Sequence, residues 1–464
     1  MKAPVGGSMA VSGGPKPAQR LSGAEIRRSL ALITVAWGIF GTLWANAVTG
    51  APFTSFARQL GANDLLFGLL MAAPLLGVLG HIPSAYLIER FRSRKKVFLW
   101  AFVPQRLLWL VAAALPWLIG SDRPSARLAL LAAVVLSSSL LSNAGSNAWL
   151  GWTADIIPER VRGRYLANRM RLATAVGVAG AALAGWVLDL NSSMIVYSAV
   201  FAIASLLGTT DVMLFHLIPE PEMPHEETVT LKGMFSGPLR DPDFRRYLLY
   251  SASEGLAFGV VVPVFWLFAM EYLQLGKLYC NLYLLIVPSV MTALSVSFWG
   301  RITDRYGCRP VILVNSGLLV LLPLVWLVTE RQWHWLLLLH GLMGGVFGGA
   351  VTIADSNLWY RMTPARGRPA YLATAFIVGG IAGGLGPVIG GAMCQALSGF
   401  AARVGMFHVT GLHVVFMLSA ALRAIHVLFF APRLREHGSS GPKRLISDGI
   451  IAPAFKVLRP PNER

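Results

Sequence analysis

An acidic residue stands inside an apolar stretch of the sequence. Glu254 lies in "YLLYSASEGLAFG", residues 247–259, roughly ten residues into a segment long enough to cross a membrane. At a rise of about 1.5 Å per residue, this places it about 15 Å along a helix, close to the middle of a bilayer. Ionisable groups at that depth are costly, and they often carry function. A carboxylate there can take up and release a proton, or it can be the structural partner of a buried arginine.

Neutral and acidic polar residues occur in other apolar segments. Asp355 lies in "TIADSNLWYR", and Asn46, Asn143 and Asn147 lie in two segments nearer the N-terminus. Each can hydrogen-bond to a solute, but hydrogen bonds between neighbouring helices explain such residues equally well. They are therefore candidate substrate contacts beside Glu254.

Two arginines also interrupt apolar segments. Arg106 lies in "VPQRLLWL", Arg423 lies in a segment near the C-terminus, and Asp211 occupies a repeat position similar to that of Arg423. We expect structural pairing for all three. If the solute is an anion, Arg106 is the best candidate to contact it, because a guanidinium can bind an anionic group in a bidentate manner.

The composition places these residues in a membrane protein. The chain has 464 residues, of which 55% are hydrophobic and only 13% charged, with a mean hydropathy of +0.59. Several windows exceed the roughly 18 apolar residues that mark a bilayer-spanning helix. Residues 1–28 are polar and basic, and they lack the pattern of a removable signal peptide. The twelve predicted spans are 29–57, 64–88, 97–119, 126–150, 164–188, 192–217, 244–271, 277–299, 310–329, 333–359, 370–396 and 408–431.

The net charge of +18 reflects an uneven distribution of basic residues. With both termini inside, most Lys and Arg residues fall at the cytoplasmic side, as the positive-inside rule requires. This predicts a multi-pass protein of the plasma or inner membrane with cytoplasmic termini. Its basic inner loops are expected to contact anionic lipids. Because the basic residues are explained by topology, nucleic-acid binding is not expected. The exceptions are Arg58, Arg123, Arg127, Lys277, Arg331 and Arg403 on the outer side and Arg106 and Arg423 within spans.

The spans form two halves. Residues 218–243 are acidic, Pro-rich and without apolar periodicity, and they separate residues 29–217 from residues 244–432. Residues 433–464 form a basic tail. "IPERVRGRYLANR" after span four has a partner in "TPARGRPAYLATA" after span ten, which indicates a duplicated six-helix unit in parallel orientation.

A polar loop between spans eight and nine carries the most specific motif. "GRITDRYGCRP" contains Gly300, Asp304, Arg305, Gly307 and Arg309, which match the signature loop of the major facilitator superfamily, and the sequence resembles that family over residues 29–431. Cys308 departs from the motif's basic pair. A worn copy, "AYLIERFRSRKKVFL", follows span two and contributes Glu89, Arg90 and Arg94, with Arg92 where the second Gly belongs. Gly307 is expected to permit a tight reversal of the chain.

The resemblance implies an all-α polytopic membrane protein, with twelve transmembrane helices in two pseudo-symmetric six-helix bundles. It implies a secondary active transporter that moves a small solute by alternating access, with Glu254 coupling transport to protons or another ion. Asp304 would meet Arg162 and Arg164 at the start of span five as a cytoplasmic latch, although these charges can equally anchor the loop. The alternatives are a passive facilitator and a non-transporting receptor or assembly factor of the same fold.

Several classes of chemistry find no support in the sequence. There is no phosphate-binding Gly-x4-Gly-Lys-Ser/Thr loop, no His-Glu-x2-His and no Gly-x-Ser-x-Gly, and the three cysteines lack metal-ligand spacing. We therefore expect no enzyme, no cofactor and no metal, and a monomer as the oligomeric state. The small residues of "GGIAGGLGPVIGG" in span eleven are expected to serve close helix packing.

Overall fold

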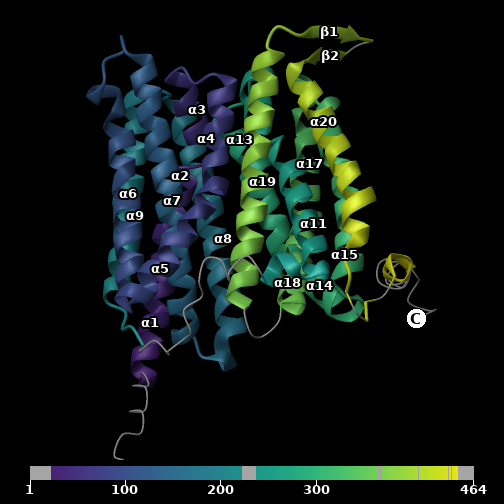
Figure 1. Ribbon diagram of the computed structural model, residues 1–464. Coiled ribbons are helices and arrows are strands. Elements are labelled where there is room, and N and C mark those ends of the chain that lie inside the picture. Colours follow the sequence, from purple (N-terminus) through teal and green to yellow (C-terminus); the bar gives the residue numbers. More distant parts are fainter. Residues whose placement is uncertain are drawn as a thin grey trace, which may run out of the picture.

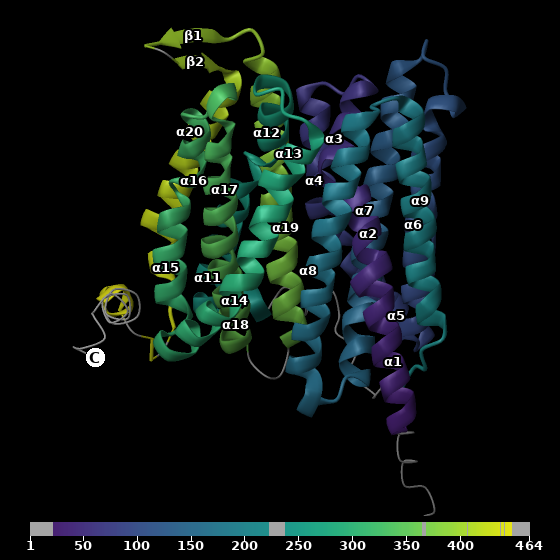
Figure 2. The same cartoon turned by 180° about the vertical axis from the view of Figure 1, so that it is seen from behind.

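The structure is a computed structural model that describes residues 22–221, 237–363, 368–405, 407–436, 438–439 and 441–447. Twelve of its helical segments are long and apolar enough to cross a membrane, which confirms the predicted span count and the all-α fold class. They stand side by side as two bundles (Figures 1 and 2). The predicted central loop falls largely on residues 222–236, which lie outside the described residues.

The first bundle contains six spans. The first span, Gly23–Gln59, is interrupted by a π-helical stretch, Ala36–Gly41, and by a break before Gly50, whose φ is +62°. Some spans are longer than predicted, such as Pro124–Ile156 and Lys277–Tyr306, whereas Met194–His216 lies within the predicted bounds. The helices are α1 (Gly23–Val35), α2 (Thr42–Ala47), α3 (Gly50–Gln59), α4 (Asp64–Leu76), α5 (His81–Phe91), α6 (Arg94–Leu118), α7 (Pro124–Ile156), α8 (Glu159–Leu190) and α9 (Met194–His216).

The second bundle repeats this arrangement and adds one hairpin. Strands β1 (Ala401–Val404) and β2 (Phe407–Thr410) pair antiparallel between the last two spans, an element that the sequence did not predict. Further π-helical stretches cover Phe268–Tyr272, Leu282–Ile286, Gly344–Gly348 and His426–Phe430. The helices are α11 (Pro242–Gly259), α12 (Val262–Leu267), α13 (Lys277–Asn281), α14 (Val287–Tyr306), α15 (Cys308–Leu319), α16 (Leu322–Leu327), α17 (Leu337–Met343), α18 (Gly349–Met362), α19 (Arg368–Ala396), α20 (Gly411–Ile425) and the short α21 (Pro442–Arg444).

Side-chain caps fix where several spans begin. Asn63 accepts a hydrogen bond from the backbone of Leu66 at the start of α4, and Ser93 accepts one from Lys96 at the start of α6. Such caps satisfy amide groups that the first turn of a helix leaves without partners. The spans therefore begin at polar residues that border the apolar runs.

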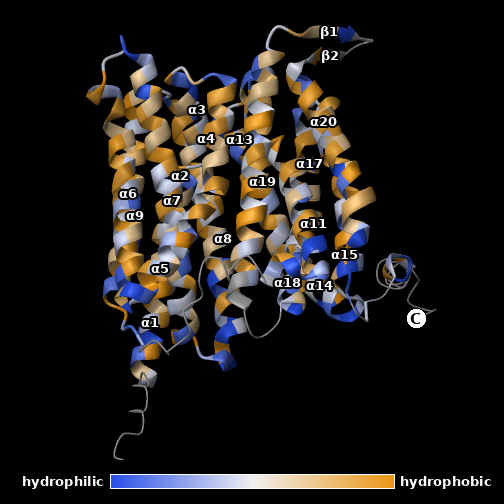
Figure 3. Ribbon diagram, in the orientation of Figure 1, coloured by the Kyte–Doolittle hydropathy of each residue, from blue (hydrophilic) through white to orange (hydrophobic). Residues whose placement is uncertain are grey.

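The two ends of the molecule differ. α1 begins and α21 lies at one end, here called the terminus end, whereas β1 and β2 lie at the other, the hairpin end (Figure 1). Apolar residues dominate the middle of the bundles, and hydrophilic residues gather at the terminus end (Figure 3). This banding is typical of helices that cross a bilayer.

Small residues allow the bundles to touch. α4 of the first bundle packs along α19 of the second, where a Cβ added to Gly68 would lie 2.4 Å from the carbonyl oxygen of Pro387. On another face of α19, a Cβ on Gly390 would lie 1.9 Å from the carbonyl oxygen of Val260. The small residues of α19 therefore serve close packing against both its own bundle and the opposite one, as expected for this stretch.

Candidate functional site: a cavity between the bundles

A cavity of about 930 Å³ lies between the two bundles and is lined mainly by the second. Its wall extends toward the terminus end as far as Met170 on α8, Trp359 on α18 and Leu372 on α19. Apolar and aromatic side chains dominate the wall. The polar side chains that line it are Asn143, Tyr247, Ser251, Glu254, Thr292, Thr352, Asp355 and Ser356.

Glu254 lies on the α11 wall of this cavity, about two helical turns after Tyr247 and one turn after Tyr250. The helix packs on α19 through Gly255 and Gly259, so the face with Glu254 is held against the inter-bundle space. In the described part of the chain, the Glu254 carboxylate makes no hydrogen bond or ion pair of normal length. The Tyr250 hydroxyl and Asp355, the other acid of the wall, are near enough to interact with it electrostatically.

Asp355 reaches the cavity from α18. Its Oδ2 accepts a hydrogen bond of 3.2 Å from the hydroxyl of Tyr247, whereas its Oδ1 is buried without a partner among the described residues. The hydroxyl of the fully buried Tyr250 likewise makes no hydrogen bond of normal length there. Buried polar atoms without partners cost free energy, commonly about 1–3 kcal/mol each, and are therefore rare in folded proteins. The acid pair thus lies in an environment with spare hydrogen-bonding capacity.

Arg423 on α20 lies behind the cavity wall. Its guanidinium carbon is 3.7 Å from the ring centre of Phe258, which lines the cavity, and its Nη1 donates to the carbonyl of Leu319 at 3.0 Å. Only 2% of Arg423 is exposed, and no ion pair joins it to Glu254 or Asp355 in the described residues. It interacts with the Glu254 carboxylate electrostatically, at a distance, rather than by direct contact.

Arg106 has a different environment in the first bundle. Its Nη2 lies 2.9 Å from Asp211 Oδ2, and both side chains are 2% exposed. Its guanidinium also stacks on Trp44 at 3.6 Å and donates to Gln105 Oε1. The structural pairing expected for Arg106 and Asp211 is present, and Arg106 lies in the bundle interior rather than on the cavity wall. Arg423, for which pairing was also expected, has no such carboxylate contact within the described residues.

The three asparagines bond mainly within their own bundle. Asn46 donates to the Thr42 carbonyl and Asn143 to the Ser139 carbonyl, each one turn earlier on the same helix. Asn147 Nδ2 lies 3.5 Å from the hydroxyl of Ser84. Only Asn143 of these three belongs to the cavity wall.

At the hairpin end an ion-pair network closes the space between the bundles. Arg58 on α3 contacts Glu271 of the second bundle through two hydrogen bonds of 2.5 and 2.9 Å, and it also pairs with Asp64 at 2.8 Å. The bidentate geometry orients both groups. The network therefore ties the first two spans to the seventh.

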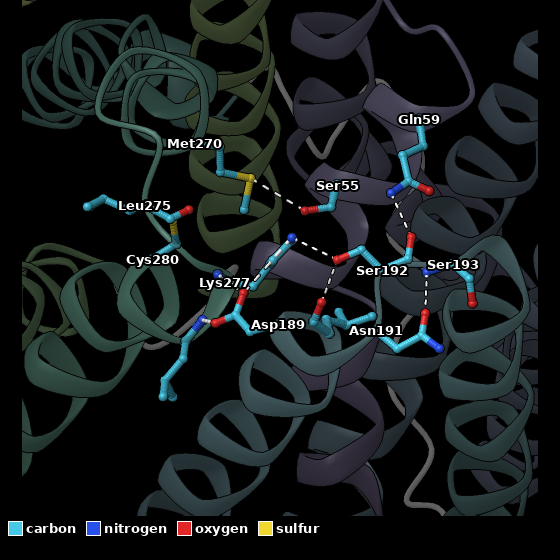
Figure 4. A network of polar contacts seen from close by, with 12 residues as sticks. Ser55, Gln59, Asp189, Asn191, Ser192, Ser193, Met270, Leu275, Lys277 and Cys280 are labelled. Carbon is cyan, nitrogen blue, oxygen red and sulfur yellow. Dashed lines mark hydrogen bonds and ion pairs between the residues drawn. The ribbon is translucent and has the colours of Figure 1, made fainter. Parts of the chain in front are cut away.

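A second set of contacts joins α8 to α13 at the same end (Figure 4). The Asp189 carboxylate accepts hydrogen bonds from the backbone amides of Lys277 and Leu278, at 2.7 and 3.0 Å, so it caps a helix of the opposite bundle. Deeper down, Asn281 accepts from the Ala51 amide and donates to the Ala181 carbonyl. The cavity is thus shut toward the hairpin end and faces the terminus end.

The signature loop lies at the terminus end, at the turn from α14 to α15. Gly307 has a φ of +97°, in agreement with the predicted tight reversal. The amides of Cys308 and Arg309 donate to the Glu436 carboxylate at 3.0 and 2.7 Å, and Arg361 pairs with the same group at 2.8 Å. Gly300, Asp304 and Arg305 lie on the last turns of α14, with Asp304 and Arg305 exposed.

The worn copy of the motif forms a similar turn in the first bundle. Arg92 takes the left-handed conformation, with a φ of +49°, where the second Gly of the motif belongs. Glu220 accepts from the Ser93 hydroxyl at 2.6 Å and from the Lys95 amide at 3.0 Å, so it occupies the place that Glu436 has in the second bundle. Arg94 forms an ion pair with Asp155. Glu89 and Arg90 are exposed.

The predicted latch is open in this conformation. Arg162 donates to the carbonyls of Ala154 and Ile157, and Arg164 is exposed. Within the described ranges, Asp304 makes no hydrogen bond or ion pair with either arginine. If the latch forms only when the terminus end closes, these charges are expected to be apart in the present conformation. The gating role of the latch stays a prediction.

Sequence reasoning missed several residues of this arrangement. Tyr247 and Tyr250 precede Glu254 by two turns and one turn on α11, so helical periodicity could have placed them beside it. No local signal marks the partners of Arg58, Asp189 and Asn281, because they come from distant spans. The described residues contain no group of three or more His, Cys, Asp or Glu side chains arranged to hold a metal ion.

Comparison with known proteins agrees with this architecture. Multidrug resistance protein MdtG of Dickeya zeae is 29% identical over 206 residues, which cover 42% of this chain and 46% of that protein. MdtG of Salmonella typhi is 27% identical over 190 residues, 39% of this chain and 42% of that protein. The chain therefore matches less than half of the length of these curated relatives.

Solved structures match over more of the chain. A point mutant of the nucleoside transporter NupG superposes with a TM-score of 0.67 at 13% identity, over 89% of this chain and 99% of that one. A bacterial homologue of the human lysosomal transporter Spinster, in an inward-facing and unoccupied conformation, gives a TM-score of 0.65 at 14% identity, over 89% and 98%. At these identities the likeness establishes the fold.

The family profile of the Major Facilitator Superfamily matches residues 33–295 and again residues 247–462. Together the two matches cover nearly all of the twelve spans, and they overlap where the second bundle begins. The twelve helices, the two similar bundles and the loop at Gly307 agree with this assignment. The chain belongs to the Major Facilitator Superfamily.

Proposed function

We propose that the protein is a secondary active transporter that moves a small organic solute by alternating access, with protons as the coupling ion. Glu254 is the proposed coupling group and Asp355 its partner, and Asn143 is a further candidate for a polar contact with the solute. The observation that carries the proposal is the position of two carboxylates, without cationic partners in the described chain, on the wall of an inter-bundle cavity. A carboxylate in apolar surroundings favours its neutral form, so proton occupancy there responds to access from either side.

Alternating access requires two closures that form in turn. In the proposed cycle, the Arg58–Glu271 pair and the Asp189 cap hold the hairpin end shut. When they break, the bundles rock and Asp304 meets Arg162 and Arg164 at the terminus end. The functional units of this motion are residues 29–217 and 244–432, joined by 218–243.

The same proposal gives the protein a place in the cell. The terminus end is basic and is assigned to the cytoplasm, with both tails inside, in a plasma or inner membrane. The conformation described would then be inward-facing. We propose a monomer, because each chain contains both bundles and a complete cavity.

The test uses purified full-length protein in proteoliposomes under an imposed pH gradient. A panel of small organic solutes is offered outside, and mass spectrometry measures their content inside. Accumulation above the outer concentration, abolished by a protonophore, is the expected result. Equilibration without accumulation would identify a passive facilitator, and the absence of any flux would favour a receptor or assembly factor with this fold.

A further inference from the structure

A second pocket, of about 630 Å³, lies at the terminus end of the second bundle and shares no lining residue with the cavity between the bundles. Four arginines line it: Arg246 from the first turns of α11, Arg309 from the first turn of α15, and Arg433 and Arg435 from the chain at the end of the last span. Glu436 is the only acid among its described lining residues. Three segments that are distant in sequence therefore bring arginines to one pocket.

The acids that pair with these arginines are already engaged. Both carboxylate oxygens of Glu436 accept backbone amides of α15, and its Oε1 also pairs with Arg361 on α18 at 2.8 Å. Asp243 forms an ion pair with Arg246 and lies 3.8 Å from Arg435. With Arg361 included, five arginines share two acids among the described residues, which leaves an excess of three positive charges. Such a concentration of positive charge in a concave site attracts an anion.

Two of the arginines have donors available for that anion. Arg309 Nε is buried and has no hydrogen-bond partner among the described residues, while its Nη2 donates to the Pro432 carbonyl at 3.1 Å. Arg433 is exposed, and within the same ranges it makes no hydrogen bond or ion pair. Buried donors are seldom left unsatisfied, and the planar fork of a guanidinium fits the oxygens of a phosphate. The pocket is therefore suited to a phosphate group.

The surface beside the pocket is apolar. α11 packs against α20 and against the π-helical stretch that follows it, and α20 runs along the flank of the second bundle that faces away from the first (Figures 1 and 2). Leu249 follows Arg246 by three residues, on the same face of α11, and is 53% exposed. Leu428 and Phe429, in the π-helical stretch, are 68% and 56% exposed. Exposed apolar residues on the flank of a membrane-spanning bundle contact acyl chains, whereas a free phosphate ion has no use for them.

We infer that this pocket binds the phosphodiester headgroup of an anionic phospholipid, whose acyl chains lie along Leu249, Leu428 and Phe429. The inference goes beyond solute transport and does not depend on it. A zwitterionic headgroup binds less well, because its own cation opposes the excess of arginines. The bound lipid joins residues 432–436 to α11 and α15, and since it binds only the folded chain, it stabilises that chain.

The experiment adds phosphatidylglycerol or phosphatidylcholine, with identical acyl chains, to the purified full chain in detergent. Titration followed by native mass spectrometry measures the affinity, and thermal unfolding measures the stabilisation. Phosphatidylglycerol is expected to bind at least about tenfold tighter than phosphatidylcholine and to raise the melting temperature more. Glycerol phosphate and inorganic phosphate, which have no acyl chains, are expected to bind at least about tenfold more weakly than phosphatidylglycerol. Equal affinity for the two lipids, or equally tight binding of either free phosphate compound, would overturn the inference.

Variants assign the binding to the pocket. The double variant Arg433→Gln/Arg435→Gln should weaken phosphatidylglycerol binding about tenfold and remove most of its stabilising effect. Both side chains are exposed, so the melting temperature without lipid should change little. Arg27→Gln/Arg28→Gln removes two exposed arginines of α1 at the same end of the molecule and is the matched control, which should bind as wild type. Arg246→Gln is a second pocket variant, on a different helix, with the same expected loss of binding.

Two results with these variants would contradict the site. An equal loss of binding in the pocket and control double variants would show that affinity follows net charge rather than the pocket. Wild-type binding by both pocket variants would place the lipid elsewhere. If the tail variant does not fold, Arg246→Gln against the α1 control still decides.

Discussion

The two bundles each bury an arginine beside an aromatic ring, and the surroundings of these arginines differ. In the first bundle, Arg106 stacks on Trp44 and pairs directly with Asp211. In the second, Arg423 stacks on Phe258, but no carboxylate within the described residues lies at ion-pair distance from it. The two arginines belong to spans that are not equivalent in the repeat, the third and the twelfth. Each bundle therefore has its own cation–aromatic contact, and only the contact in the first bundle is joined by an ion pair.

We assign a structural role to the ion pair of the first bundle and a functional role to the acids of the second. In the first bundle the two charges of the pair neutralise each other directly. The acids of the second bundle, Glu254 and Asp355, face the cavity and keep their capacity to bind a proton or a ligand. The asymmetry thus concentrates the proposed chemistry in the second bundle, whereas the first supplies a stable wall.

The largest effect is expected from breaking the buried pair. Asp211→Ala leaves the Arg106 charge without its partner, and loss of one member of a buried ion pair commonly costs about 3–5 kcal/mol. Unfolding of the purified protein in detergent, followed by helical circular dichroism, measures this. A double variant, Arg106→Met with Asp211→Leu, should recover most of the stability. If Asp211→Ala were as stable as Asp122→Ala, which changes an exposed acid, the pair would not have the role assigned to it.

A smaller effect is expected for the arginine of the second bundle. Arg423→Met removes no direct ion pair and leaves mainly the Leu319 carbonyl without a donor, a cost of about 1–3 kcal/mol. The same unfolding measurement, made beside Arg106→Met, tests the asymmetry. A loss for Arg423→Met that equals or exceeds the loss for Arg106→Met would contradict it.

At the terminus end we expect matched substitutions in the two bundles to have equal effects on stability. Glu220 and Glu436 each accept backbone amides at the start of the third and ninth spans. Replacement of either by Gln removes a negative charge from a helix N-terminus, which is expected to cost about 0.5–1 kcal/mol. Equal decreases in melting temperature for the two variants would support an equivalent role of the two glutamates in the two bundles. A clearly larger shift for Glu220→Gln would show that the worn copy has diverged in energy as well as in sequence.

The smallest change in stability is expected at the contact between the bundles. Arg58 and Glu271 are partly exposed, so Glu271→Gln should alter the unfolding free energy by less than about 1 kcal/mol. Its effect should appear in the conformational equilibrium, as greater labelling of a cysteine placed at Ala51, which is now buried at the hairpin end. Equal labelling with and without the Glu271→Gln change would mean that this pair does not hold the hairpin end closed.

The sequence predicted the elements of this fold because membrane insertion imposes strong local rules. Length, hydropathy and charge bias identified twelve spans, and a left-handed Gly307 followed from the loop motif. The β-hairpin at residues 401–410 was missed, because its two strands of four residues carry little periodicity.

The candidate site was predictable only in part. Glu254 and Asp355 stood out because acids in apolar runs are rare. Which of the polar residues share one cavity depends on helix rotation, and this is set by packing against distant spans; hence Asn143 faces the cavity while Asn46 does not belong to its wall. The Arg58–Glu271 closure required partners from both bundles and has no local pattern.

The central claim is that Glu254 couples protons to transport. The most direct measurement compares wild type, Glu254→Gln and Asp122→Asn in proteoliposomes with an imposed pH gradient, using the solute that wild type accumulates most. The account predicts accumulation by wild type and Asp122→Asn, and no more than equilibration of the solute by Glu254→Gln at similar folded yield. Accumulation by Glu254→Gln to the wild-type level would contradict it.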